Sequence, residues 1–286
     1  KEFFRGFSPG EIRKHVRPAD WFVLAFLIVG IISTMQSDYV YESFWGNEGR
    51  FTGLFLHLIY GIGFLVISHL YRFKKWHMDL FLAVAMLPLL FGITDYFNLD
   101  LLGFKAEISS NDRFSFMSTF GNINTYATYI GMVFGCLGIL LVEEKRLGKI
   151  ILYVVEFAIT SLALIMCNSD NALLAAGLVF ALVPLAAFRS RRGLMGYTIL
   201  LTIFFAMARV TGWTETAFAE KVISLEGACR MVAELPGLRL VTGALLLISV
   251  VLGIRERKKQ TDGIYGKKYT RVWGVFLILC VCAGLF

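Results

Sequence analysis

Arg50 is the first residue of this sequence whose type and surroundings suggest chemistry. It lies in a polar segment between two apolar runs, close to Gly46, Gly49 and Gly53. Glycine lets backbone approach a ligand closely, and a planar guanidinium offers paired hydrogen bonds to phosphate. The segment therefore predicts an anion site. The alternative is an interfacial turn in which the arginine reaches the lipid headgroups beside an aromatic belt. That belt would comprise Tyr39, Tyr41, Phe44 and Trp45.

Arg113 is the second candidate, because it precedes the polar run Ser118–Asn124 at the start of another apolar stretch. A helix start exposes unpaired N–H groups with a partial positive charge, so an anion is favoured there. The alternative is structural: Ser118 or Thr119 caps the helix, and Asn124 bonds to a neighbouring helix. Residue types alone leave these two interpretations about even.

The turn Asn168-Ser169-Asp170-Asn171 between two apolar runs is the third polar element. Here Asp170 could orient an arginine or a sugar hydroxyl. The structural alternative is strong, since Ser, Asp and Asn are the preferred residues at helix caps.

Other titratable residues lie within or beside apolar runs, where they are functional candidates by default. Arg209 is the foremost of these, Glu156 is expected to be a buried hydrogen-bonding partner, and His57 is the third. The histidines, cysteines and acidic residues show no metal-ligand spacing and no serine-histidine-aspartate arrangement, so we expect no metal and no cofactor. The five cysteines are expected to be small core residues rather than a disulfide framework.

The elements that must position these residues are membrane helices. Of the 286 residues, 57% are hydrophobic and only 17% are charged. Apolar runs recur that are each about long enough to cross a hydrocarbon core of about 30 Å. We therefore predict an all-α fold, a polytopic transmembrane helical bundle forming a single domain over residues 1–286. The nine expected spans are Trp21–Met35, Leu54–Leu70, Leu80–Asp95, Ile123–Val142, Ile150–Cys167, Ala172–Phe188, Leu194–Val210, Leu238–Ile254 and Val272 to the end.

The distribution of positive charge predicts the orientation of this bundle. Three quarters of the 28 lysines and arginines lie in segments that alternate spans place on one side. Since basic residues accumulate in cytoplasmic loops, that side and the N-terminal segment are expected to be cytoplasmic. The extracytoplasmic loops are then 36–53, 96–121, 168–171 and 211–237. The basic residues are markers of topology, so nucleic acid is not an expected partner.

This orientation places all three polar elements outside the cytosol. The helices that begin at Leu54, Ile123 and Ala172 would all start there, and their positive ends could converge beside Arg50 and Arg113. A diphosphate at the membrane surface would fit such a site. The loop 211–237 has apolar residues at a spacing that suggests a short amphipathic helix, and we interpret it as a connector.

The order and spacing of three motifs resemble the O-antigen ligase and O-antigen polymerase family, in the branch common in Gram-positive bacteria. The motifs are Gly46-x-x-Gly-Arg-x-x-Gly53, Ser118-Thr-Phe-Gly-Asn-Ile-Asn124 and Asn168-Ser-Asp170. The resemblance implies an enzyme of the bacterial cytoplasmic membrane that performs metal-independent, inverting glycosyl transfer outside the cytosol. Its donor would be an undecaprenyl-diphosphate-linked glycan, and its acceptor a glycan or lipid-linked sugar.

The resemblance also implies roles for particular residues. Arg50 and Arg113 would bind the donor diphosphate and stabilise charge that grows on the leaving group. The cavity and sugar contacts would come from Gly49, Gly53, Asn122, Asn124, Ser169 and Asp170. The family usually carries a large extracytoplasmic loop with a histidine after a span placed like the one that begins at Val272. Because this chain starts at Lys1 and stops at Phe286, we expect a fragment that is truncated at both ends, lacks this catalytic loop and is inactive alone.

Two other functions are compatible with a basic outer cavity. A transporter or flippase for lipid-linked sugars would also need charges and broken helices near the midplane, usually in paired repeats. The sequence shows no such pairing. A non-catalytic membrane scaffold would tolerate loss of both Arg50 and Arg113.

Overall fold

The computed structural model describes residues 16–47, 51–109, 112–258 and 266–284, and these residues contain helices and connecting segments but no strand. The chain divides into two compact units, Lys1–Lys75 and Trp76–Phe286, each of which is described by itself. The predicted all-α class is confirmed. The single domain over residues 1–286 stays a prediction, as does the assignment of its four extracytoplasmic loops.

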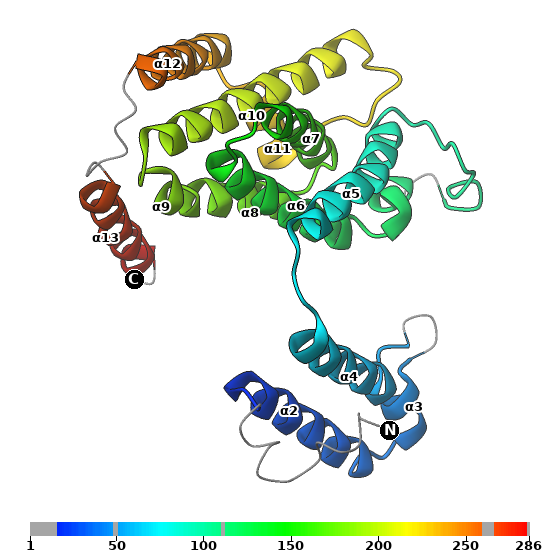
Figure 1. The fold of residues 1–286 in the computed structure, drawn as a ribbon. Helices are drawn as coiled ribbons and strands as arrows, with labels where there is room; N and C mark the ends of the chain where they lie inside the picture. The colour runs from blue at the N-terminus through cyan, green and yellow to red at the C-terminus, as the bar shows by residue number, and fades with distance from the viewer. Residues whose placement is uncertain (1–15, 48–50, 110–111, 259–265, 285–286) are drawn as a thin grey trace. The chain divides into compact units, whose positions relative to one another are not determined.

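The first unit is a pair of antiparallel helices joined by a short helix (Figure 1). Helix α2 (Pro18–Met35) packs against α4 (Leu54–Leu70), and α3 (Val40–Trp45) lies between them in the chain. Close approach is possible because Gly61 of α4 faces Leu27 of α2, where an added Cβ would lie 2.5 Å from a leucine methyl. The end of α4 is held to the start of α2, because His69 Nε2 lies 2.9 Å from Oδ2 of the buried Asp20.

The second unit is a helical bundle built around α6 (Ile123–Glu143), α7 (Leu147–Met166) and α10 (Arg191–Ala217). In its aromatic core the ring centroids of Phe134 and Phe157 lie 4.6 Å apart with the rings tilted by 35°, and those of Phe180 and Phe204 lie 4.9 Å apart. Burial of such rings is a large source of stability. The other helices are α5 (Lys75–Tyr96), α8 (Asp170–Leu182), α9 (Pro184–Ala187), α11 (Gly227–Ala233), α12 (Leu238–Lys258) and α13 (Gly266–Gly284).

Six of the described helical segments are long and apolar enough to cross a membrane. They are Pro18–Met35, Lys75–Tyr96, Ile123–Glu143, Leu147–Met166, Asp170–Ala187 and Arg191–Ala217. A seventh is possible if α11 and α12, which are bent by 66° at a short break, form one span. The multi-pass membrane character predicted from composition is thereby confirmed.

Nine spans, in contrast, are not shown. The predicted span Leu54–Leu70 is a helix of only 17 residues, about 25 Å long and therefore shorter than a typical hydrocarbon core. The predicted span Leu238–Ile254 qualifies only together with α11. Helix α13 contains the expected last span, but Lys267, Lys268 and Arg271 lie in its first turns.

Candidate functional site

One end of the second unit is built from three connecting segments that are far apart in the sequence. The segment after α10 lies against the end of α5, where Ile223 N donates to Tyr96 O at 2.8 Å. Asn98 Nδ2 in the following segment donates to Lys221 O at 3.2 Å. The predicted outer segments 96–121 and 211–237 therefore lie at the same end of the bundle.

The turn that contains Asn168 joins the same assembly. The Asn168 side chain donates from Nδ2 to Ser224 O at 3.1 Å and accepts at Oδ1 from Glu226 N at 2.8 Å. On the other side of the turn, Asn171 Nδ2 donates to Asn124 Oδ1 at 3.0 Å. The structure thus brings together two of the three motifs, Ser118–Asn124 and Asn168–Asp170.

A buried carboxylate, Asp95, organises this end of the bundle. Asp95 lies in the last turn of α5 and is 1% exposed. Its Oδ1 lies 3.1 Å from Lys105 Nζ, and its Oδ2 accepts from Ser118 N at 2.6 Å. Buried charges are expected to be paired and hydrogen-bonded in this manner. Neither Asp95 nor Lys105 was predicted from the sequence as part of a site, although a carboxylate at the end of an apolar run is a functional candidate.

Ser118 fixes the loop after Asp95 onto α5. It has a left-handed backbone with φ of 54°, begins the 3-10 turn η2 (Ser118–Phe120), and is fully buried. Its Oγ donates to Pro88 O at 2.6 Å. One turn further along α5, Gly92 leaves room for the Tyr126 hydroxyl of α6. Backbone strain at Ser118 is thus offset by two hydrogen bonds that set the position of the loop.

Arg113 begins the 3-10 turn η1 (Arg113–Ser115) and is exposed. Its Nε donates to Ile108 O at 3.0 Å, which is the only side-chain bond it makes within the described ranges. The guanidinium borders a cavity of about 200 Å³. The cavity is lined by Asp95, Asn98, Asp100, Lys105, Arg113, Phe114 and Ile223. Both carboxylates are engaged, since Asp95 pairs with Lys105 and Asp100 Oδ2 accepts from Lys105 N at 2.9 Å. Arg113 therefore brings a guanidinium group to a cavity whose walls also hold two carboxylates and the Lys105 ammonium.

Asn122 and Asn124 have their side chains in structural bonds. Asn122 is the N-cap of α6, because its Oδ1 accepts from Asn124 N at 2.9 Å and from Thr125 N at 3.1 Å. Asn124 holds Asn171, as described above. The amide groups keep further donors, so their predicted contact with sugar stays a prediction.

Asp170 serves another helix rather than its own turn. Its Oδ1 accepts from Ala228 N at 3.1 Å, so this carboxylate caps the start of α11. Gly227 lies close to this carboxylate, because a Cβ added to it would be 3.0 Å from Asp170 Oδ1. Its φ is 53°. Ser169 is buried, and its carbonyl oxygen accepts from Cys229 Sγ at 3.8 Å. Burial, together with the nearby Cys229, raises the pKa of the adjacent Cys167 thiol, which keeps it neutral.

A second cavity, with two arginines in its walls, lies where α10 meets the bend between α11 and α12. Its volume is about 400 Å³ and its walls include Arg209, Leu235, Leu238 and Arg239. Glu234 also lines it, with Oε1 at 3.1 Å from Arg230 Nε. Arg209 was singled out from the sequence, whereas Arg239 was not, because no local pattern places it beside Arg209.

In the first unit, Gly49 and Arg50 lie outside the described residues. Gly53 shows what the flanking glycines do: a Cβ on it would lie 2.3 Å from Phe44 O and 2.4 Å from Gly46 N. Gly46 has φ of 90°, and its own added Cβ would meet Thr52 N at 2.3 Å. The close approach allowed by these two glycines is therefore an approach of the loop to itself.

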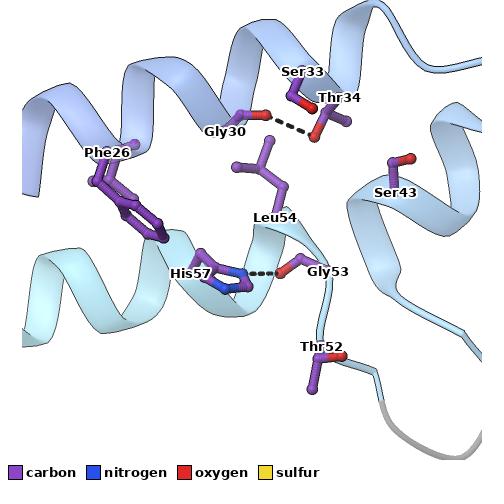
Figure 2. A pocket seen from close by; sticks show the side chains of 10 residues that line it. Phe26, Gly30, Ser33, Thr34, Ser43, Thr52, Gly53, Leu54 and His57 are labelled. Carbon is purple, nitrogen blue, oxygen red and sulfur yellow. Dashed lines mark hydrogen bonds between the residues drawn. The ribbon is translucent and has the colours of Figure 1, made fainter. Parts of the chain in front are cut away.

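The same unit contains a cavity of about 300 Å³ between α2 and α4, which Figure 2 shows from close by. Phe26 and His57 lie on one side of it, and the hydroxyl side chains of Ser33, Thr34 and Ser43 on the other. His57 Nδ1 lies 2.9 Å from Gly53 O. Since His57 borders a polar cavity, it remains a candidate for binding.

At the other end of the second unit, Asp79 of α5 pairs with α7. Its carboxylate meets Lys149 Nζ at 2.5 Å and accepts from Tyr153 OH at 2.6 Å. Glu156, one turn further, is 4% exposed, and its Oε2 has no hydrogen-bond partner among the described residues. It is buried as predicted, whereas the hydrogen bond expected for it is not found at Oε2 among the described residues. Within the described ranges, no group of three or more His, Cys, Asp or Glu side chains could hold a metal ion.

Comparison of the whole chain with protein-family models, with curated proteins and with solved structures finds no match.

Proposed function

We propose that this chain takes part in glycosyl transfer at the outer face of a bacterial cytoplasmic membrane. It would move a glycan from undecaprenyl diphosphate to a sugar acceptor, in the manner of O-antigen ligases and polymerases. The motif resemblance supports the reaction class, and the membrane helices support the location. Arg113 would bind the diphosphate, and the same role implied for Arg50 stays a prediction, because Arg50 lies outside the described residues.

The observation that carries the proposal is the position of Arg113. It borders a polar cavity at the same end of the bundle as two of the three family-like motifs. The cavity of Arg209 and Arg239 is built at the same end, because α11 packs on the last turns of α10. Its leucine walls suit a prenyl chain, and its guanidinium groups suit a phosphate.

The chemistry asked of these residues is electrostatic. In an inverting transfer, the acceptor hydroxyl oxygen bonds to the anomeric carbon while the bond from that carbon to the diphosphate breaks. The hydroxyl proton passes to a base, and undecaprenyl diphosphate leaves with increased negative charge. Fixed guanidinium groups would stabilise that charge more strongly in the transition state than in the ground state.

The experiment replaces these arginines in the complete protein, in cells that lack any other copy. Arg113→Ala should reduce transfer of glycan to the acceptor by roughly 10- to 100-fold, the effect of losing a hydrogen bond to a charged group. Arg113→Lys should recover only part of the activity, because an ammonium cannot make paired bonds. Arg50→Ala and the pair Arg209→Ala and Arg239→Ala are measured in parallel.

Lys221→Ala is the matched control, because Lys221 is an exposed cation of the same segment and is not among the described residues that line either cavity. It should transfer glycan at the normal rate. Lipid-linked glycan should accumulate on the outer leaflet of the Arg113→Ala cells. Normal transfer in the variants of Arg113, Arg50 and the Arg209–Arg239 pair would contradict the proposal and favour a scaffold.

A transporter of lipid-linked glycan is the second candidate, and one observation favours it. The 66° bend between α11 and α12 is the kind of broken helix that transporters use at their binding sites. The leaflet in which the substrate accumulates separates the two functions. A transporter variant would leave lipid-linked glycan on the cytoplasmic leaflet, whereas a transferase variant would leave it outside.

A further inference from the structure

The cavity between α2 and α4 has walls that are fixed by the packing of the first unit (Figure 2). Its volume of about 300 Å³ lies at the lower end of the usual range for small-molecule sites. Gly30 of α2 lets Leu54 approach closely, because an added Cβ would lie 3.3 Å from a leucine methyl. Helix α3 is held against α4, where the ring centroids of Trp45 and Phe55 lie 5.1 Å apart. The cavity is therefore a built feature of this unit.

His57 presents a hydrogen-bond acceptor to this cavity. Its Nδ1 lies 2.9 Å from Gly53 O, and because a carbonyl oxygen can only accept, Nδ1 carries the proton of that bond. In the neutral imidazole the other ring nitrogen, Nε2, is then an acceptor. Nε2 has no hydrogen-bond partner among the described residues, so it is available to a ligand that donates.

Two hydroxyl groups on the other side of the cavity have already used their protons. Thr34 Oγ1 donates to Gly30 O at 2.9 Å, and Ser43 Oγ donates to Ser37 Oγ at 2.7 Å. A hydroxyl whose proton is engaged can still accept at its oxygen lone pairs. These two oxygens, like His57 Nε2, therefore favour a ligand that donates hydrogen bonds.

The remaining walls combine free hydroxyl groups with an apolar face. Ser33 and Thr52 line the cavity without a side-chain hydrogen bond to any described residue, so each can donate and accept. Phe26 is 58% exposed, and its ring centroid lies 5.7 Å from that of His57 with the rings tilted by 50°. The two rings provide a wall for the C–H face of a ligand whose polar groups lie along its edge.

These walls distinguish between classes of ligand. A phosphate offers acceptor oxygens, which cannot pair with the three acceptors at His57, Thr34 and Ser43. An ammonium group donates, but the described lining residues include no carboxylate that would balance its charge. A sugar ring fits both kinds of wall, because its hydroxyls donate as well as accept and its C–H face can cover an aromatic ring.

We propose that this cavity binds an uncharged pyranose unit of a glycan, with its hydroxyls on His57, Thr34 and Ser43 and its C–H face on Phe26. Gly53, for which the motif resemblance implies a sugar contact, lines the cavity beside His57. The proposal deepens the proposed function and rests on it for the source of the sugar. Sugar binding is measured without any lipid-linked donor, so a failure to bind is distinguishable from a failure of transfer.

The test uses saturation-transfer NMR on the purified full chain in phosphatidylcholine nanodiscs. The probes are the methyl glycosides of glucose, galactose and N-acetylglucosamine, and at least one of them should bind saturably. Its fully O-methylated derivative keeps every oxygen but cannot donate from these positions, so it should bind about tenfold more weakly or less. Inorganic phosphate and ethanolamine in excess should fail to displace the sugar.

Variants of the lining residues locate the binding. Ser33→Ala and Phe26→Ala change exposed side chains, so folding should be unaffected, and each should weaken sugar binding by about three- to tenfold. His57→Phe keeps the ring but removes the acceptor and should weaken binding by about tenfold. Phe22→Ala is the matched control, because Phe22 lies one turn earlier on α2, is exposed and does not line the cavity. It should bind the sugar normally.

Three results would overturn the proposal: no binding of any of the three glycosides, equal binding of the O-methylated derivative, or displacement by phosphate or ethanolamine. Unchanged affinity in both Ser33→Ala and Phe26→Ala would also overturn it, because the sugar would then bind elsewhere. A loss of transfer in Arg113→Ala would still support the proposed function in each of these cases. Sugar binding at this cavity together with normal transfer in all the arginine variants would instead support the site and contradict the proposed function.

Discussion

At the residue scale, Asp95 decides how the candidate site is held together. It pairs with Lys105 and accepts the backbone N–H of Ser118, so a single carboxylate joins α5, the loop 96–121 and the start of η2. The Lys105 ammonium is used to pair with Asp95 rather than to bind an external anion. Their role is to hold the loop that carries Arg113, which is a positioning role.

Asp95→Asn is expected to destabilise the second unit by about 3–5 kcal/mol, because it leaves the ammonium of Lys105 buried without its partner. The free energy of unfolding in detergent is the measurement. Lys105→Met in the same background should recover much of the loss, since it removes the uncompensated charge.

The matched control is Lys221→Met, which removes an exposed lysine from the same end of the bundle. It should change stability by less than about 0.5 kcal/mol. If Asp95→Asn with Lys105→Met were no more stable than Asp95→Asn alone, the pair would not be the source of the effect.

At the scale of elements, the segment 211–237 is more than the connector that its sequence suggests. The helix expected there is present as α11, and α10 runs on to Ala217, beyond the predicted end at Val210. Glu215 near the end of α10 accepts from Leu225 N at 2.9 Å, and Asp170 caps α11. The segment is thus tied at both ends to the polar turns of the bundle.

Asp170→Ala is expected to cost about 0.5–2 kcal/mol, the usual effect of losing a side chain that accepts from the first N–H groups of a helix. Asp170→Asn should cost less, because its amide oxygen can still accept from Ala228 N. Hydrogen exchange at residues 224–230 is the direct readout, and exchange there should rise in the order wild type, Asn, Ala.

Exchange in α13 serves as the internal control, because α13 packs against α9 rather than against this segment. Equal protection of residues 224–230 in all three proteins would show that the carboxylate does not hold the segment.

At the scale of the whole molecule, the orientation in the membrane determines which end of the second unit faces out of the cell. Hydrogen bonds join segments 96–121, 168–171 and 211–237 at one end, whereas the turns at 144–146 and 188–190 lie at the other ends of the same helices. The excess of basic residues in the latter predicts that they are cytoplasmic.

Single cysteines at exposed positions test this orientation. In intact cells, Leu101→Cys and Glu220→Cys should react with a membrane-impermeant maleimide, whereas Lys145→Cys and Arg189→Cys should react only after lysis. The unmodified chain gives the background. Its Cys167 and Cys229 are buried, whereas Cys280 and Cys282 are exposed, so the prediction that all five cysteines are core residues is wrong for these two and they contribute to the background. Labelling of Lys145→Cys from outside would invert the orientation and remove the basis of the proposed function.

The sequence by itself determined the helical class, the multi-pass membrane character and the positions of the polar segments. These follow from local quantities: the length of an apolar run against the thickness of a bilayer, and the residue types at its ends. It also identified Arg113 and Arg209, because a charge beside an apolar run is conspicuous without any knowledge of its neighbours.

Only the tertiary structure decided which polar groups meet. Asp170 caps a helix that starts 57 residues later, Asn168 binds Glu226, and Arg239 lies with Arg209 in one cavity. The bend between α11 and α12 likewise has no local signature that distinguishes it from a straight span. A hydrogen bond between distant segments depends on how the helices between them pack. The packing energy is distributed over many side chains, so no single sequence motif determines it.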